Sequence, residues 1–269
     1  MPNLSIIIPV YQTELPQLLE SVASVVNAAP KDSEIHIGFD GPYPEEDLRC
    51  LSRLESAGSG PKLRISHFER QGLVGTLNAL IQCSDCKYLA RQDSDDICLP
   101  NRFEDQMRAL NAAKKAAFCG TQVTRCDKHM QPFRLQRRYP KRFLGQLLYA
   151  CLLNNPIAHP SLMIRREIIN NQRYRDLPGA EDWDLYIRLW EEGYQSFNLD
   201  QPGLLYRVHA QQITQQPRNS DLLCDLKARS LKAAERHYLS SRLLKPVQSI
   251  SNSLKFTEMG ILAKGWLDR

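Results

Sequence analysis

The chain has 269 residues, of which 42% are hydrophobic and 24% charged. This balance is typical of a folded globular protein and excludes disorder as the main state. The longest uninterrupted apolar run, Leu147 to Leu153, is far shorter than the ~20 residues of a membrane-spanning helix. The first residues lack the basic start and long apolar stretch of a signal peptide, so we expect a cytoplasmic protein.

The formal net charge of +5 is confined to the end of the chain. Residues 227–269 contain nine basic and three acidic side chains, whereas residues 1–226 contain 26 basic and 27 acidic ones. A nucleic-acid-binding protein more often carries its basic surface on the folded body. We therefore expect a nearly neutral body with a basic appendage and no nucleic-acid partner.

The eight cysteines are scattered, and Cys83 and Cys86 form the one close pair. Without a second pair at zinc spacing, a structural zinc site is not expected. Reduced thiols fit a reducing compartment.

In the first 91 residues, predicted strands alternate with predicted helices. The run Leu4 to Val10 is apolar without alternation, which is typical of a strand covered on both faces in a parallel sheet. Residues 15–26 have apolar side chains at helical spacing. Strands over 34–39, 63–68 and 88–91 and helices over 44–57 and 74–82 follow. This alternation predicts an α/β fold with a doubly wound, mostly parallel central sheet.

Beyond residue 115 the pattern becomes mixed. Strands are predicted over 116–124, 161–164 and 204–208, with an apolar segment at 144–153 and helices near 181–192 and 219–240. We expect one globular domain over residues 1–215, with a first half of about 1–115 and a second of about 116–215. A helical, basic, amphipathic extension over 216–269 would follow.

Ligands of such sheets bind at the carboxyl ends of the strands. The most informative of these positions is Asp93-Ser94-Asp95-Asp96, directly after the strand at 88–91. Its three carboxylates would repel one another unless a cation or solvent separates them. Oxygen ligands of this kind suit Mg²⁺ or Mn²⁺. The alternative is an exposed acidic turn that caps the helix starting near Pro100.

Two further motifs carry candidate chemistry. Glu181 and Asp182 occupy the first turn of a predicted helix, where they either stabilise the helix dipole or place a general base beside the metal site. His209 ends the motif Tyr206-Arg207-Val208-His209, where it is either structural or a metal ligand.

Two basic segments also have alternative interpretations. The cluster from Arg134 to Arg142 is either a solvated loop or faces phosphates of a substrate or lipid. Residues 240–269 combine apolar residues at helical spacing with lysines and Trp266, which is typical of a segment lying on an anionic membrane. The alternative is that this segment packs on the body or on a second subunit.

Taken in order, these motifs resemble those of the bacterial family 2 glycosyltransferases, inverting enzymes of the nucleotide-diphospho-sugar transferase (GT-A) fold. The resemblance covers about residues 3–214. The matching segments are Ile8-Pro9-Val10-Tyr11, Asp40-Gly41, Gly72-Leu73 with Asn78, Asp93-Ser94-Asp95-Asp96, Pro100-Asn101-Arg102, residues 159–165 from His159 to Arg165, Glu181-Asp182-Trp183-Asp184-Leu185, and Tyr206-Arg207-Val208-His209.

The resemblance implies a role for individual residues. Asp182 would be the catalytic base, and Asp95 with His209 would hold Mn²⁺ or Mg²⁺ at the donor diphosphate. Glu181, Trp183 and His159 would support the acceptor side, within an acceptor pocket built by residues 134–159 and the start of the 181 helix. The donor UDP-sugar would contact Pro9, Tyr11, Asp40, Arg70, Asn78, Arg91 and Asp93.

Two positions depart from the family pattern. The turn after the second strand offers the single acid Asp40 where the family often has two, and Leu77 stands where many members have Arg before the matched Asn78. Arg70 or Arg91 would supply that charge.

The resemblance implies metal-dependent transfer of a hexose from a UDP-sugar to a saccharide hydroxyl with inversion, giving a β-linkage. We expect a polyprenyl-diphosphate-linked acceptor in O-antigen or capsule synthesis, at the inner face of the cytoplasmic membrane. A soluble oligosaccharide or protein acceptor is the alternative. The rivals are an aspartyl-phosphate phosphotransferase, which lacks its downstream pattern here, a non-catalytic sugar-nucleotide-binding module, and a nucleotidylyltransferase, whose Gly-rich basic loop is absent after the first strand.

Overall fold

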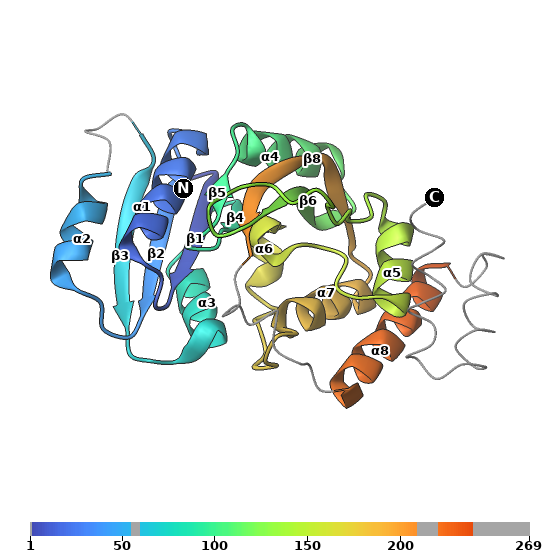
Figure 1. Cartoon of the computed structure of the whole chain (residues 1–269). Helices are drawn as coiled ribbons and strands as arrows, with labels where there is room; N and C mark the ends of the chain where they lie inside the picture. The colour runs from blue at the N-terminus through green and yellow to red at the C-terminus, as the bar shows by residue number, and fades with distance from the viewer. Residues whose placement is uncertain (1, 55–59, 209–219, 239–269) are drawn as a thin grey trace.

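The first half of the chain is a βα repeat, as the sequence predicts (Figure 1). The structure is a computed structural model that describes residues 2–54, 60–208 and 220–238. The elements are β1 (Leu4–Val10), α1 (Leu15–Ala28), β2 (Glu34–Asp40), α2 (Glu45–Ser52), β3 (Lys62–Phe68), α3 (Gly72–Gln82) and β4 (Tyr88–Arg91). The four strands pair in parallel in the order β3-β2-β1-β4.

The second half extends the same sheet with mixed pairing. Its elements are β5 (Ile97–Cys98), α4 (Arg102–Ala112), β6 (Ala116–Cys126), α5 (Phe143–Leu152), the 3₁₀ helix η1 (His159–Ser161), β7 (Met163–Arg165), α6 (Arg166–Ile169), α7 (Glu181–Glu191), β8 (Gln195–Arg207) and α8 (Ser220–Tyr238). β7 lies antiparallel between β4 and β6, and β8 pairs parallel with β6 and antiparallel with β5. The full order is β3-β2-β1-β4-β7-β6-β8-β5.

Two differences from the sequence prediction affect the second half of the sheet. The strand expected over 161–164 begins as η1 and becomes β7 at Met163. β8 begins at Gln195 rather than near Leu204, because its first residues are largely polar and its pairing with β6 shifts register, so no simple alternation marks it.

The sheet separates two hydrophobic clusters, which explains the continuous apolar run of β1. Ile7 points into the cluster formed with α3, α5, α7 and α8, whereas Ile6 and Ile8 point into the cluster formed with α1 and α4. All seven residues of β1 are buried. A strand with polar residues on one side would leave one of these clusters unfilled.

Helix α8 shares this core, although the sequence analysis assigned its residues to an extension. Leu226, Ser230 and Ala234 are fully buried, and α8 packs on α5 and α7 at the end of the molecule away from α2 (Figure 1). Arg229 Nη1 donates to the buried Asp184 Oδ1 of α7 at 2.8 Å. The predicted membrane-binding segment 240–269 lies outside the described residues.

Candidate active-site cleft

A cleft of about 1300 Å³ opens where the first strands end and α7 begins. This volume is large enough for a nucleotide-sized ligand together with a second substrate. Ten of the predicted site residues line it: Pro9, Tyr11, Asp40, Arg70, Arg91, Asp93, Asp95, His159, Glu181 and Asp182.

Three predicted site residues remain. His209 lies outside the described residues. Trp183 is fully buried in the core beneath the cleft. Asn78 is not among the residues that line the cleft, and its side-chain amide makes two hydrogen bonds to the backbone of Tyr174. Asn78 instead ties α3 to the segment before α7.

Asp40 organises one end of the cleft. Its carboxylate accepts hydrogen bonds from the backbone N–H groups of Gln71 (2.7 Å) and Gly72 (3.2 Å) at the start of α3, and it forms an ion pair with Arg70. Gly72 has φ +77°, a left-handed conformation that favours glycine. The Arg70 guanidinium lies 3.4 Å from the centroid of the Tyr11 ring. Tyr11 is 48% exposed, so the stack offers a flat face to a ligand.

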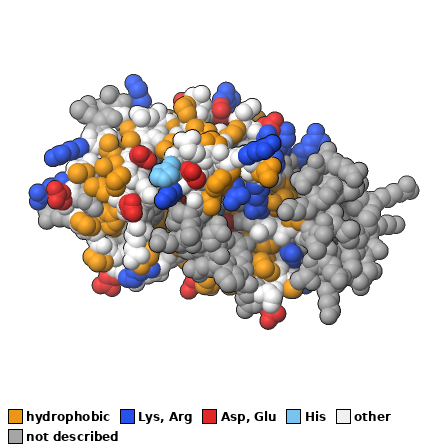
Figure 2. Space-filling model, in the orientation of Figure 1, with side chains coloured by type: hydrophobic (Ala, Val, Ile, Leu, Met, Phe, Trp, Pro, Cys, Tyr) orange, Lys and Arg blue, Asp and Glu red, His pale blue; other side chains and the backbone are white. Residues whose placement is uncertain are grey.

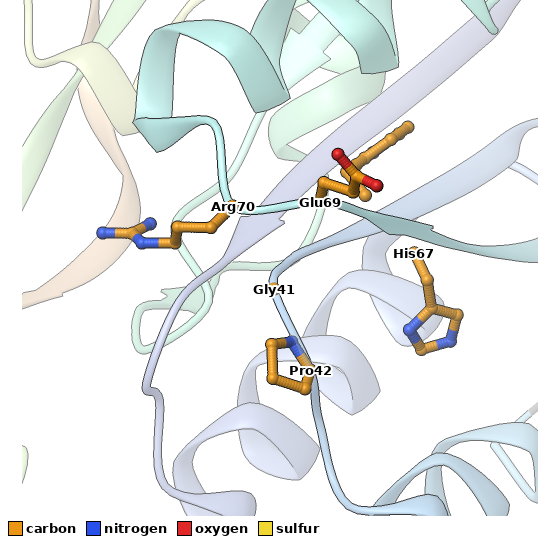
Figure 3. A pocket seen from close by; sticks show the side chains of 6 residues that line it. Gly41, Pro42, His67, Glu69 and Arg70 are labelled. Atoms are coloured by element: carbon orange, nitrogen blue, oxygen red, sulfur yellow. The ribbon is translucent and has the colours of Figure 1, made fainter.

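A second, smaller hollow of about 500 Å³ lies beside this end of the cleft (Figure 3). It is formed by the turns that follow β2 and β3, and Arg70 borders both hollows. Figure 3 shows the Arg70 side chain pointing away from Pro42 and His67. The guanidinium therefore belongs to the larger cleft.

The acidic turn after β4 is held by hydrogen bonds to its backbone and side chains. Ser21 of α1 donates to the Asp93 carbonyl at 2.9 Å, and Thr13 and Ser94 share a hydrogen bond of 2.6 Å between their hydroxyls. Arg207 donates from Nε to the Asp95 carbonyl at 2.8 Å. The turn is therefore part of the fold rather than a loose acidic loop.

The charges of this turn have separate environments. Asp93 forms an ion pair with Arg91, and Asp95 faces the cleft. Burial, reinforced by Asp95 and Asp93, raises the pKa of the fully buried Asp96 well above its usual range. Burial alone would lower the pKa of Arg91, but Asp93, Glu181 and Asp182 outweigh it and raise that pKa. Arg91 is thus a buried cation between the acidic turn and α7.

Asp182 is positioned by two hydrogen bonds on the other side of Arg91. Its Oδ2 accepts from Asn155 Nδ2, and its Oδ1 accepts from the backbone N–H of Trp183 at 2.7 Å. The carboxyl is mostly buried, with 12% of its side chain exposed to the cleft. A carboxylate oriented in this way can accept a proton from a bound hydroxyl.

His159 lies beside both acids of α7. Its Nδ1 is 3.9 Å from Glu181 Oε1 and 4.0 Å from Asp182 Oδ2, and its Nε2 is 2.9 Å from the Tyr174 hydroxyl. Burial, together with the charge of Arg91, holds the pKa of His159 well below its usual range. The ring is therefore neutral near pH 7, and it packs beside the Asp182 carboxyl rather than forming a strong ion pair with it.

The acidic turn fits a divalent cation in chemistry. Asp95, with Asp93 beside it, presents the hard oxygen ligands that Mg²⁺ and Mn²⁺ prefer. Within the described part of the chain, no group of three or more His, Cys, Asp or Glu side chains is arranged to hold a metal. A metal at Asp95 would therefore take most of its other ligands from substrate phosphates and water.

Sequence reasoning missed two residues that organise the site. Asn155 contacts Asp182 from 27 positions away, and Arg102 is a buried cation that donates to the carbonyls of Arg91 and Pro160 at 2.7 Å each. Asn155 falls within the segment expected to build the acceptor pocket, and Arg102 within a matched motif. Neither position gives a local signal of its actual contacts.

Comparison with known proteins identifies the family of the chain. The model of the family described as "Glycosyl transferase family 2" matches residues 5–172, which is more than half of the chain. The chain belongs to this glycosyltransferase family. The α/β sheet described above is accordingly a GT-A fold, and the protein is a glycosyltransferase.

Three curated relatives illustrate the family. The amylovoran biosynthesis glycosyltransferase AmsE of Erwinia amylovora is 28% identical over 208 residues, covering 77% of this chain and 76% of its own. The putative glycosyltransferase EpsE of Bacillus subtilis is 26% identical, covering 77% and 73%. The O-antigen biosynthesis glycosyltransferase WbnJ of Escherichia coli is 28% identical, covering 70% and 73%. Enzymes of the family generally use a divalent metal. No helix within the described ranges has the length and apolarity needed to span a bilayer.

Proposed function

We propose that this glycosyltransferase moves a hexose from a UDP-sugar to a saccharide hydroxyl with inversion, and that Asp182 is the catalytic base. The observation that carries the proposal is that Asp182 and the acidic turn line the same cleft, together with the buried Arg91, which forms an ion pair with Asp93. A donor and an acceptor bound in this cleft would meet beside the Asp182 carboxylate.

Different residues of the cleft bind the donor and activate the acceptor in this proposal. Tyr11, Arg70 and Asp40 form the nucleobase end, where an aromatic ring stacked with a guanidinium offers a surface for a base. At the other end, the Asp182 carboxylate accepts the proton of the acceptor hydroxyl as that oxygen attacks the anomeric carbon. A single displacement inverts this carbon, so an α-linked donor gives a β-linked product. Asn155 holds the accepting carboxylate in place.

A divalent metal would be held by Asp95, with Asp93 beside it, and by the donor diphosphate. When bound it would supply Lewis-acid stabilisation of the leaving diphosphate. We assign His209 to this metal only through its matched motif, since it lies outside the described residues.

The acceptor belongs, in our proposal, to the assembly of a surface polysaccharide such as O-antigen or capsule. The printed names of AmsE and WbnJ, which refer to amylovoran and O-antigen biosynthesis, support this assignment. We propose an acceptor linked to a polyprenyl diphosphate, with peripheral membrane contact through residues 240–269. A soluble oligosaccharide or protein acceptor is the second candidate.

The test compares Asp182→Asn with Asp176→Asn, a matched change at an exposed position outside the cleft. UDP binding is measured by calorimetry, and turnover by UDP release from a panel of UDP-sugars, followed by mass spectrometry with lipid-linked acceptors. Loss of a positioned base lowers the rate by about 10²- to 10⁴-fold. We expect this loss in Asp182→Asn with UDP affinity retained, and no loss in Asp176→Asn. Normal turnover in Asp182→Asn would remove Asp182 from the role, and UDP binding without any turnover in the wild type would favour a non-catalytic module.

A further inference from the structure

Three cations of the cleft lie on its β6 side. Arg125 at the end of β6, Lys128 just after it, and Arg137 in the following loop all line the cleft. In the described part of the chain, none of the three makes an ion pair with Asp or Glu. By contrast, the cleft residues Arg70 and Arg91 pair with Asp40 and Asp93. The β6 side of the cleft therefore carries a net positive charge, because the one acid beside these cations in the described sequence, Asp127, does not line the cleft and has its pKa lowered in part by Lys128.

Arg137 is held in the wall of the cleft by neutral partners. Its Nε donates to the Tyr149 hydroxyl at 2.9 Å, and its Nη2 donates to the Asn155 carbonyl at 3.0 Å. The guanidinium also lies 4.9 Å from the ring centroid of Tyr139 and 5.4 Å from that of Tyr149. The cation is thus fixed in direction while its charge is left for a ligand, and it contacts the residue that binds Asp182.

Arg125 and Lys128 extend this charge along β6. Arg125 pairs in register with Tyr206 of β8, and its guanidinium lies 5.8 Å from the Phe133 ring centroid. Tyr139 lies close to these groups. Its pKa is raised, chiefly by burial and in part by Asp182, whereas Arg137 and Arg125 oppose this rise. Arg125, Arg137 and Asp182 therefore all act on Tyr139, which lines the same cleft.

The loop that follows β6 adds exposed apolar side chains to this end. Leu135 is 84% exposed and Phe133 38% exposed, and these two and Tyr11 are the large hydrophobic residues most exposed among those described. Arg134 and Arg138 beside them are also exposed. Figure 2 shows Lys and Arg side chains interspersed with hydrophobic ones over the region where β6 and this loop lie in Figure 1. Charge inside the cleft and apolar surface at its edge match an amphiphilic anion.

We propose that Arg125, Lys128 and Arg137 form a subsite for the diphosphate of a prenyl-diphosphate-linked acceptor, and that Leu135 and Phe133 contact the start of its isoprenoid chain. This inference rests on the proposed function, because it assigns the second substrate of that reaction. It places the phosphates of the acceptor next to Asn155, so that the sugar they carry reaches Asp182.

The donor diphosphate is the competing occupant. Arg207 donates to the Lys128 carbonyl at 2.6 Å and to the Asp95 carbonyl at 2.8 Å, so Lys128 is linked to the acidic turn through one side chain. An anionic lipid headgroup is another source of the same phosphate chemistry. The experiment must separate all three.

The experiment uses the full-length protein with UDP and Mg²⁺ at saturation. Calorimetry measures the binding of farnesyl diphosphate, inorganic pyrophosphate and farnesol, and co-sedimentation measures binding to phosphatidylglycerol vesicles. The test variant is Arg125→Gln/Lys128→Gln, which leaves the packed Arg137 intact. The control, Lys114→Gln/Lys115→Gln, removes the same charge from exposed positions that lie outside the proposed acceptor segment and do not line the cleft.

We expect farnesyl diphosphate to bind alongside UDP, and its Kd to rise about tenfold or more in the test variant, because two charge-assisted contacts are lost. The Kd of UDP should stay within about twofold, as should both Kd values in the control. Leu135→Ser should weaken farnesyl diphosphate and leave pyrophosphate unchanged, and farnesol should bind the wild type poorly.

Two results would overturn the subsite. In one, farnesyl diphosphate competes with UDP and the test variant raises the Kd of both, which would show that the cations bind the donor diphosphate. In the other, the test variant binds farnesyl diphosphate as the wild type does but binds vesicles more weakly, which would show that the cations bind a lipid headgroup. These measurements do not require transfer, so failure of the Asp182→Asn test leaves them interpretable.

Discussion

Replacing Arg229 by Met tests how α8 supports the helix that carries Asp182. Arg229 donates to the fully buried carboxylate of Asp184 at 2.8 Å and to Glu191 at 3.2 Å. The hydrogen bond to a buried charge is worth about 1.5–3 kcal/mol. The Glu191 contact is more exposed and adds about 0.5 kcal/mol. Arg188 still binds Asp184 at 2.8 Å, so the loss stays below the ~3–5 kcal/mol of a fully orphaned buried charge. We expect a loss of about 2–3 kcal/mol in the free energy of unfolding.

Urea denaturation at pH 7 measures this loss as a lower midpoint. Lys232→Met, an exposed change on the same helix, serves as the control and should stay within about 0.5 kcal/mol of the wild type. A midpoint for Arg229→Met equal to that of the control would refute the reasoning.

The pH dependence gives a second check. Burial by itself raises the pKa of Asp184, but the hydrogen bonds from Arg229 and Arg188 outweigh it and lower the pKa. The stability contributed by this carboxylate is therefore complete above the ordinary Asp pKa and is lost as pH falls through the lower folded-state pKa. The difference between Arg229→Met and the wild type should accordingly shrink in strong acid.

Three further outcomes are expected. Gly120→Ala would place a Cβ 2.6 Å from Ile157 Cγ2 and should lower the free energy of unfolding by about 1–3 kcal/mol, measured by heat or urea. The control Gly145→Ala in α5 should change this free energy by less than about 1 kcal/mol. Equal effects of the two changes would contradict the packing argument. Because the folded-state pKa of His159 is lowered, stability should fall as pH drops below 6.5, and His159→Gln should flatten that fall in denaturation curves taken between pH 7 and 5. Asp95→Asn should raise the Mg²⁺ concentration needed for half-maximal UDP binding by about tenfold, and an unchanged metal requirement would remove Asp95 from the metal site.

The first half of the fold was predictable because its signals are local. The β1 run needs apolar side chains on both faces, and the acidic turn directly follows a buried strand, so both are legible in a few consecutive residues. The start of β8 was not, because its register shifts against β6 allow polar residues in a strand.

The contacts around the proposed base were not predictable for a different reason. Asp182 stands in a recognisable motif, but its partner Asn155 is fixed by tertiary packing. The position of Asn78 matches the motif order, but its side-chain amide binds the backbone of Tyr174, 96 positions away in the sequence. Motif order identified the cleft, and long-range packing decided which side chains reach it.

The hydrogen bonds that hold the acidic turn have a consequence for the entropy of ligand binding. Ser21, Thr13 and Arg207 fix the turn from α1, from the β1–α1 loop and from β8, so its backbone is ordered when the chain folds. A ligand then gains its contacts there without immobilising a loop, which is the advantage of a preorganised site. The acidic turn should therefore select ligands by fixed shape and charge rather than by changing its own conformation. Ser21 does not line the cleft, but its hydroxyl binds the carbonyl of Asp93, which does. Ser21 therefore influences the cleft through the position of Asp93.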